Sequence, residues 1–132
     1  MIRAVLADSG PLYAAADEDD IYHQQALLEL QKLAKDRREV VIAYPTLIEA
    51  YGLLLFRMGT AAALKWLTFM SDAVLVNPTP EDYRQAFTRV RGLPDQRVTL
   101  VDATMGALAM RLGLKVWTYD HHFDVMRIPV WR

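Results

Sequence analysis

The segment "TLVDATMGALAMRLGLKVWTYD" (residues 99–120) joins an apolar helix pattern to a short strand pattern. The helix pattern stops at Gly113, and glycine is a common residue at helix ends. The next residues, "KVWTY" (115–119), are rich in β-branched and aromatic side chains, which favours a strand that closes on Asp120. A helix that leads straight into an apolar strand is typical of the βαβ units from which parallel sheets are built.

The rest of the chain repeats this alternation. Apolar, β-branched runs predict further strands at residues 2–7, 39–44 and 73–77, with a short edge strand at 128–131. Helical spacing of apolar residues predicts helices at residues 10–16, 22–35, 45–59, 60–70, 79–92 and 99–113. We therefore expect an α/β fold in which helices cover both faces of a parallel sheet.

The composition agrees with one domain spanning residues 1–132. Hydrophobic residues make up 53% and charged residues 23% of the chain, as in ordinary soluble proteins. Cysteine is absent, which excludes disulfides, thiolate zinc sites and cysteine nucleophiles and fits a reducing compartment. We expect a cytoplasmic protein, because no stretch resembles a signal peptide or a membrane span.

The net charge of −1 gives no general sign of nucleic-acid binding. The charges are nevertheless partly segregated, because "DEDD" (residues 17–20) lies in the amino-terminal half and several arginines lie in the other half. Those that we consider as weak RNA phosphate contacts are Arg84, Arg89, Arg91 and Arg97. A solvated surface or local ion pairs would explain them as well.

Three carboxylates stand alone in otherwise uncharged segments. Asp8, Glu49 and Asp102 are the only charged residues within residues 4–16, 40–56 and 98–110, respectively. Burial of an ionised carboxylate without a partner carries a large free-energy penalty. Each of these acids should therefore be protonated, cap a helix or turn, or share a cation with the others.

Helix capping is the simpler explanation. The segments "TLIE" (46–49), "TLVD" (99–102) and "TPED" (79–82) all fit the capping-box pattern, and Thr46 is the predicted N-cap of its helix. Asp8 could likewise bond the turn at Gly10, and Asp82, which has polar neighbours, is predicted to be an exposed cap. Capping and metal binding are compatible, because a carboxylate has two oxygens.

Placement in the predicted sheet favours a shared cation. Asp8 and Asp120 each close a predicted strand, and the carboxyl ends of parallel strands meet at one edge of a sheet. Glu49 and Asp102 fall in the first turns of two predicted helices. Four carboxylates in one pocket would repel each other unless a hard cation were present, and oxygen ligands prefer Mg²⁺ or Mn²⁺. Such a site suits phosphodiester hydrolysis.

Four short motifs in this order resemble those of PIN-domain ribonucleases, in particular the VapC-type toxins of type II toxin–antitoxin pairs. They are "LADSGPLYA" with Asp8, "YPTLIEAYGLL" with Glu49, "TLVDATMGALA" with Asp102, and "TYDHHF" with Asp120. Each motif is weak alone, but the set with its spacing covers nearly the whole chain. The resemblance implies a three-layer α/β/α domain with a central parallel sheet of four to five strands.

The resemblance also implies an activity, which is Mg²⁺- or Mn²⁺-dependent cleavage of RNA. Asp8, Glu49 and Asp102 would bind the metal, directly or through water. Asp120 would complete the acidic pocket as a fourth metal residue, through water or a second ion. The residues that would orient these acids are Ser9, Thr99 and Thr118. A homodimer and inhibition by a small antitoxin protein are further implications of the resemblance.

Two alternatives concern the same residues. A catalytically inactive PIN-like module that binds RNA or protein would keep the acids as caps, although such a domain tends to lose one of them. His121 and His122 resemble a metal site, but adjacent histidines lack the usual ligand spacing, so we expect them in a surface loop. Asp124 remains a possible outer acid of the pocket.

Overall fold

The computed structural model describes residues 3–132, and its centre is a four-stranded parallel sheet in the order β3-β2-β1-β4. The strands are β1 (Ala4–Ala7), β2 (Glu39–Ala43), β3 (Val74–Val76) and β4 (Lys115–Trp117). Leu6 of β1 pairs with Val41 of β2 and with Val116 of β4. The predicted parallel sheet is confirmed. Residue 2, where we expected the first strand to start, lies outside the described residues.

Alternation along β1 explains why it lies inside the sheet. All four residues of β1 are buried, and successive side chains point to opposite faces. Leu6 belongs to the hydrophobic cluster on one face, whereas Val5 and Ala7 belong to the cluster on the other. A strand that is apolar on both faces requires helices on both sides.

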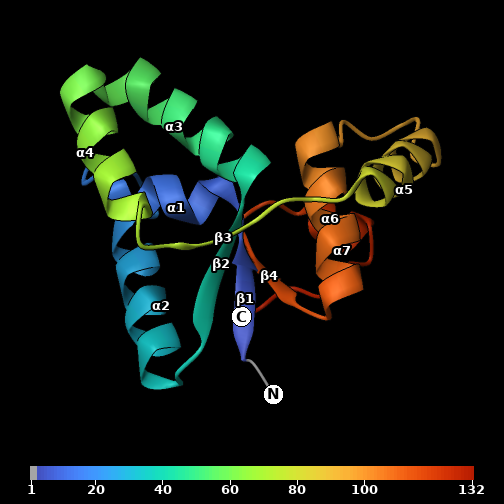
Figure 1. Cartoon of the computed structure of the whole chain (residues 1–132), viewed down its shortest axis with the longest axis horizontal. Coiled ribbons are helices and arrows are strands. Elements are labelled where there is room, and N and C mark those ends of the chain that lie inside the picture. The colour runs from blue at the N-terminus through green and yellow to red at the C-terminus, as the bar shows by residue number, and fades with distance from the viewer. Residues whose placement is uncertain (1–2) are drawn as a thin grey trace.

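The helices form the two outer layers (Figure 1). One face is covered by α1 (Ser9–Ala16) and α2 (His23–Lys35), and the other by α5 (Pro80–Arg91), α6 (Leu100–Leu112) and α7 (His122–Val125). Two further helices, α3 (Tyr44–Met58) and α4 (Thr60–Met70), pack on each other, and α3 also packs on α1. The predicted α/β/α layering is therefore confirmed.

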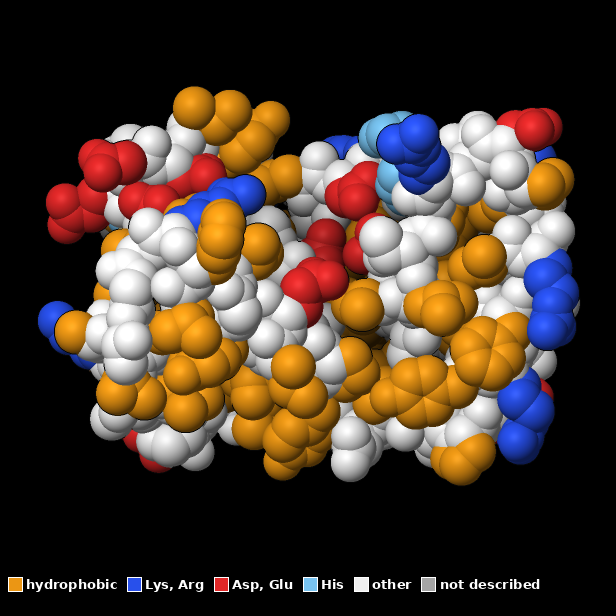
Figure 2. All heavy atoms as spheres, turned by 90° about the horizontal axis from the view of Figure 1, so that it is seen from above, with side chains coloured by type: hydrophobic (Ala, Val, Ile, Leu, Met, Phe, Trp, Pro, Cys, Tyr) orange, Lys and Arg blue, Asp and Glu red, His pale blue; other side chains and the backbone are white. Residues whose placement is uncertain are grey.

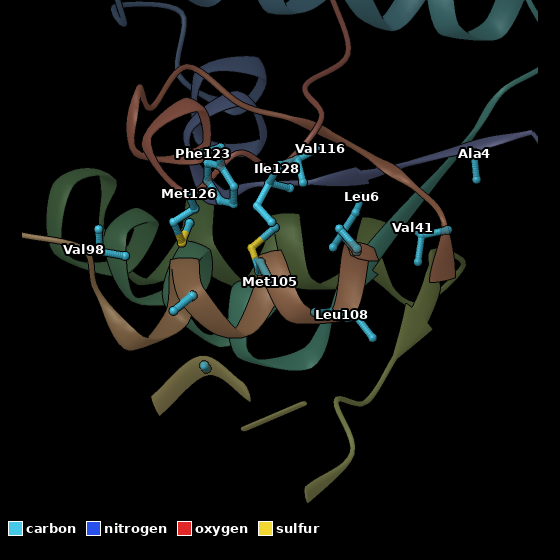
Figure 3. Packing of buried hydrophobic residues seen from close by; sticks show 14 residues of the cluster. Ala4, Leu6, Val41, Val98, Met105, Leu108, Val116, Phe123, Met126 and Ile128 are labelled. Carbon is cyan, nitrogen blue, oxygen red and sulfur yellow. The ribbon is translucent and has the colours of Figure 1, made fainter. Parts of the chain in front are cut away.

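Helix α6 supplies much of the core on its side of the sheet (Figure 3). Its buried Met105 and Leu108 lie in one cluster with Phe123 of α7 and with Leu6. Gly106 allows a close approach here, because an added Cβ would lie 3.1 Å from Cγ1 of Ile128. Tight packing of α6 fixes the position of its first turn, which carries Asp102.

The predicted cap of α3 is wrong. The helix begins at Tyr44, so Thr46 lies inside the first turn and does not cap it. Thr46 is fully buried, and its hydroxyl donates to the Met105 sulfur at 2.8 Å. Pro45 explains the earlier start, since proline is favoured in the first turn of a helix. Glu49 therefore lies in the second turn of α3 instead of the first.

The capping box of α5 is confirmed, but the expected exposure of Asp82 is wrong. Thr79 and Asp82 exchange the two bonds of the box at 3.1 and 2.8 Å. Asp82 is only 3% exposed, and both of its oxygens also accept from the Arg111 guanidinium at 2.9 Å. This bond from Arg111, which comes from the neighbouring α6, lowers the pKa of Asp82 despite its burial.

The carboxyl-terminal segment is less regular than predicted. Residues 128–131 form no strand, and only an isolated bridge joins Val130 to Val116 of β4. β4 itself ends at Trp117, two residues earlier than expected. No helix in residues 3–132 is both long enough and apolar enough to cross a membrane.

Candidate metal and nuclease site

The sheet reverses its winding between β1 and β4, and ligands of open α/β sheets bind at such a switch point. Asp8 follows β1 directly, and Asp120 follows β4 after two residues. The backbone N–H of Asp8 donates to the Trp117 carbonyl at 2.9 Å, which keeps the two strand ends together. The predicted convergence of these acids at one edge of the sheet is therefore observed.

Asp8 is buried, with 4% of its surface exposed. It is the N-cap of α1, and its Oδ1 accepts from the Ser9 N–H at 2.8 Å. Its Oδ2 accepts from the Thr118 hydroxyl at 2.7 Å. Both oxygens are thus held by the chain, and each keeps a further lone pair for another ligand.

Thr118 links the first and last acids of the site. Its hydroxyl donates to Asp8 and accepts from the Asp120 N–H at 2.9 Å. The loop after β4 is thereby fixed relative to β1. Thr118 was predicted to orient these acids, and its two hydrogen bonds give it a position from which it can do so.

Asp102 and Glu49 reach the same pocket from two helices. Asp102 lies in the first turn of α6 and is 6% exposed. Its N–H donates to the Thr99 hydroxyl at 3.1 Å, so Thr99 is the N-cap of α6 as its sequence suggests. The Asp102 side chain does not return the capping-box bond in the described structure and lines the pocket instead. Glu49 enters from α3.

The pocket formed by these elements has a volume of about 480 Å³. Its lining residues are Asp8, Ser9, Gly10, Glu49, Thr99, Asp102, Tyr119, Asp120 and His121. All four predicted acids are present, and so are the predicted Ser9 and Thr99. In the view of Figure 2, acidic side chains gather in a hollow near the centre of this face.

The carboxylates disturb each other's ionisation. Burial, opposed by the bonds from Thr118 and Ser9, raises the pKa of Asp8 to about 6. Burial, the charge of Asp8 and a hydrogen bond with Asp120 raise the pKa of Asp102 to about 8. Burial also opposes the ionisation of Asp120, but the His122 N–H and the Asp102 contact together lower its pKa. Without a cation, burial and the neighbouring carboxylates therefore favour the protonated form of Asp102 over that of Asp120.

The two histidines lie closer to this site than expected for a surface loop. His121 is exposed, but His122 begins α7, and only 17% of its side chain is exposed. Their Nδ1 atoms lie 3.7 and 3.2 Å from Oδ1 of Asp120, so these three residues form a compact cluster of possible metal ligands. The same Asp120 oxygen already accepts from the His122 N–H at 2.9 Å.

Other candidates lie outside the pocket. Asp124 pairs with Arg132 at 2.9 Å and is absent from the lining, so it does not join the acids. Arg84 bonds Glu81, and Arg89 donates to the Met126 carbonyl at 3.1 Å. Arg91 and Arg97 are exposed. None of the four arginines lines the acidic pocket.

Sequence reasoning missed Tyr119 and its support. Tyr119 lines the pocket, and its hydroxyl donates to Oε1 of Glu29 in α2. Trp117 donates its indole N–H to the same oxygen at 3.1 Å. Glu29 is about ninety residues from both donors in the chain, and no local pattern links them. The only signal was the position of Tyr119 between Thr118 and Asp120 at the strand end.

Comparison with protein families identifies the family to which this fold belongs. The sequence profile of the PIN domain family matches residues 5–129. The chain therefore belongs to this family, as the four motifs predicted. A comparison with curated proteins by sequence gives no match.

Solved structures with the same fold include toxins and toxin–antitoxin complexes. VapC20 from Mycobacterium tuberculosis, a Sarcin-Ricin loop cleaving toxin, has a TM-score of 0.84 at 20% identity, with 98% of this chain and 99% of that chain covered. VapBC2 from Rickettsia felis, bound to a DNA fragment from its promoter, has a TM-score of 0.76 at 13% identity, with coverages of 100% and 98%. A toxin–antitoxin complex from Klebsiella pneumoniae has a TM-score of 0.65 at 15% identity, with 97% of each chain covered.

Proposed function

We propose that this protein is an Mg²⁺- or Mn²⁺-dependent endoribonuclease and the toxin of a toxin–antitoxin pair. The observation that carries the proposal is the convergence of four carboxylates from four distant segments in one pocket. No lysine or arginine is among the nine lining residues to balance them. The similarity to VapC20, described as a Sarcin-Ricin loop cleaving toxin, supports RNA as the substrate class.

The donor set fits a hard divalent cation. The acids that line the pocket offer only oxygen ligands, which suit Mg²⁺ and Mn²⁺. The raised pKa values of Asp8 and Asp102 show that the pocket resists full ionisation when no positive charge is present. A bound ion would remove this penalty. When bound, it would lower the pKa of a water and neutralise charge on the scissile phosphate.

In this proposal, Asp8, Glu49 and Asp102 hold the metal, directly or through water. Asp120, whose side chain is one-third exposed (33%), completes the acidic set and is our candidate for accepting a proton from the attacking water. The residues that would hold these acids in place are Ser9, Thr99 and Thr118, through the hydrogen bonds described above. Arg91 and Arg97, both exposed, remain candidates for weak phosphate contacts.

The proposal is tested with purified protein and structured RNA. We expect cleavage with Mn²⁺ or Mg²⁺, no cleavage in EDTA, and loss of activity in Asp8→Asn and Asp102→Asn with an unchanged far-UV circular dichroism spectrum. Asp124→Asn is the matched control, because Asp124 lies close to Asp120 in the chain but pairs with Arg132 outside the pocket. Full activity of Asp102→Asn would refute the ligand assignment. Absence of both RNA cleavage and divalent-ion binding would favour the inactive binding module.

We infer that the antitoxin binds a second, apolar pocket of about 800 Å³. Side chains of α1, α2, α3, α4, β2 and β4 line it, among them Leu12, Leu30, Ile42, Trp66 and Phe69. Such a surface suits a partner segment with apolar side chains. Phe69 is 68% exposed, so it can be replaced to test antitoxin binding without removing a core side chain. Phe69→Asp should prevent complex formation with the antitoxin encoded beside this gene while RNA cleavage remains.

We also infer a homodimer through α3 and its surroundings. Tyr44, Ile48 and Leu55 form an exposed apolar stripe with helical spacing on α3. Leu100 at the start of α6 is also exposed, as are Tyr83 and Phe87 of α5. Figure 2 shows hydrophobic side chains along one side of the acidic hollow. Ile48 precedes Glu49 directly, so a second copy on this surface would border the pocket. We also propose that residues 1–132 form a single domain and that the protein acts in the cytoplasm, where it would meet an RNA substrate.

A further inference from the structure

Tyr119 is held rigidly at the wall of the acidic pocket. Its hydroxyl donates to Oε1 of Glu29 at 2.5 Å, and burial together with this carboxylate raises the pKa of Tyr119. Trp117 donates to the same oxygen at 3.1 Å and packs edge-on against Trp131, with ring centroids 6.4 Å apart. The Tyr119 ring is therefore fixed by α2 and by the core beneath it.

Tyr22 stacks on this fixed ring from the loop between α1 and α2. The two ring centroids are 4.8 Å apart, and the ring planes differ by 29°. The backbone N–H of Tyr22 donates to Asp20 at 2.9 Å, which orders the loop at this point. Tyr22 nevertheless remains 42% exposed, so part of its aromatic surface is open to solvent beside the pocket.

We propose that Tyr22, supported by Tyr119, stacks against an unpaired base of the RNA near the scissile phosphate. The inference deepens the proposed function and rests on it, since it names the feature of RNA that the same site recognises. Proteins that bind single-stranded RNA commonly stack splayed bases on aromatic side chains. Here the pair Tyr22–Tyr119 extends from the pocket wall to the solvent, so an added base would continue an existing stack.

The negative charge around Tyr22 favours contact with an RNA base over contact with a phosphate. The preceding residues, Asp17, Glu18, Asp19 and Asp20, are all acidic and would repel a phosphate. The flat face of a base carries no net charge and tolerates these neighbours better than the sugar–phosphate backbone does. Binding at Tyr22 should therefore depend on the aromatic ring and only weakly on salt, in contrast to binding through arginines.

Direct binding of RNA tests the inference without relying on cleavage. The probe is a short single-stranded RNA that contains 2-aminopurine, titrated with the full chain in EDTA, where stacking quenches the fluorescence. Base–aromatic stacking is worth about 1–3 kcal/mol per base, so Tyr22→Ala should raise Kd roughly 5- to 150-fold. Tyr22→Phe should restore affinity because it keeps the ring. Leu28→Ala is the control for loss of an exposed apolar side chain on α2, since Leu28 is 64% exposed.

The outcomes separate this inference from the proposed function. The Tyr22→Ala effect should have the same fold-change at about 50 and 200 mM salt, whereas a phosphate contact would lose its effect at the higher salt concentration. Wild-type affinity in Tyr22→Ala, or an equal loss in Tyr22→Phe, would overturn the stacking role while metal-dependent cleavage still stood. If the wild-type chain neither bound nor cut RNA, both proposals would fail. If Tyr22→Ala weakened only antitoxin binding, the exposed ring would be a protein contact instead.

Discussion

The Thr118 hydroxyl donates to Oδ2 of Asp8 at 2.7 Å and joins residues that are 110 positions apart in the chain. The same oxygen accepts from the Asp120 N–H at 2.9 Å. One small side chain thus fixes a buried acid at the end of β1 and a partly exposed acid after β4. In the proposed nuclease, it aligns two walls of the metal pocket without touching the metal.

Thr118→Val tests this alignment, because it keeps the shape of the side chain and removes both hydrogen bonds. We expect metal affinity or RNA cleavage to fall about 10- to 100-fold, as is typical when a group that orients a metal ligand is lost. The bond from Thr118 lowers the pKa of Asp8, so its loss should also move the pH profile of cleavage toward higher pH.

Cleavage measured over a Mn²⁺ titration at several pH values separates these two effects. Thr88→Val is the matched control, since the Thr88 hydroxyl only bonds the Arg84 carbonyl on the exposed side of α5. An unchanged metal dependence in Thr118→Val would show that Asp8 is positioned by the backbone alone.

The pocket should make the ion-free protein less stable as pH rises. The pKa of Asp8 is raised from 3.8 to about 6, and that of Asp102 from 3.8 to about 8. Both groups are protonated in either state below pH 3.8, whereas ionisation favours the unfolded chain between pH 3.8 and about 8. A divalent ion binds the ionised acids, so it should stabilise the fold more at the upper end of this window.

Thermal unfolding in EDTA and in Mg²⁺ measures this effect. We expect the increase in Tm caused by Mg²⁺ to be larger at pH 8, where Asp102 is about half ionised, than near pH 5.5. The increase should shrink in Asp102→Asn at both pH values. An equal increase at both values in the wild type would mean that ion binding does not compete with these protons.

The cluster of Asp120, His121 and His122 is an alternative metal site to the four carboxylates, and mutation of a histidine can test it. The rings of His121 and His122 are tilted by 38° with centroids 4.3 Å apart, and both approach Asp120. We expect His121→Ala to change Mg²⁺ or Mn²⁺ affinity less than about twofold, because imidazole suits Zn²⁺ better than these hard ions. Isothermal titration with each metal tests this expectation. A loss of Mn²⁺ affinity similar to that of Asp102→Asn would make His121 a ligand of the functional ion.

Much of the fold and of the pocket could be predicted because both depend on local patterns. Asp8 could be predicted as a site residue because it ends an apolar strand. Asp102 could be predicted because it is an isolated acid near the start of an uncharged helix. Parallel strands then bring such acids to one edge without further information. The family resemblance added Thr118, whose role depends on a bond across 110 residues.

Features that depend on distant partners could not be predicted. The polar neighbours of Asp82 in the sequence predict an exposed cap. Asp82 is nevertheless buried, and its carboxylate accepts a hydrogen bond from Arg111 of the adjacent helix. Thr46 fits a capping box, yet the helix starts earlier and its hydroxyl meets the Met105 sulfur. In both cases the residue fits a capping-box pattern, but contacts with a distant part of the chain determine its environment.

The apolar stripe on α3 predicts that the dimer can be broken by one charge. Ile48 is 69% exposed at the centre of the stripe, so Ile48→Asp should not disturb the monomer fold. It would place a carboxylate in the proposed interface, where burial without a partner is strongly unfavourable. Light scattering during size exclusion should show a dimer for the wild type and a monomer for the variant. Leu28→Asp, on the equally exposed face of α2, should stay dimeric; a monomeric wild type would refute the interface.

Glu29 should couple the stability of the core to RNA binding. Glu29→Ala leaves the Trp117 indole N–H and the Tyr119 hydroxyl without their acceptor. Loss of a partner for a buried donor costs about 1–3 kcal/mol of unfolding free energy. The Tyr119 ring also loses its anchor, so the stack with Tyr22 should loosen.

Denaturant unfolding and 2-aminopurine binding measure the two consequences of Glu29→Ala. Glu29→Gln is the control, because its amide oxygen can still accept from both donors. If the stack recognises a base, Glu29→Ala weakens RNA binding in a protein that is folded at the assay temperature, and Tyr22→Ala adds little further loss in the double variant. Independent, additive losses would mean that Glu29 and Tyr22 do not act through the same ring.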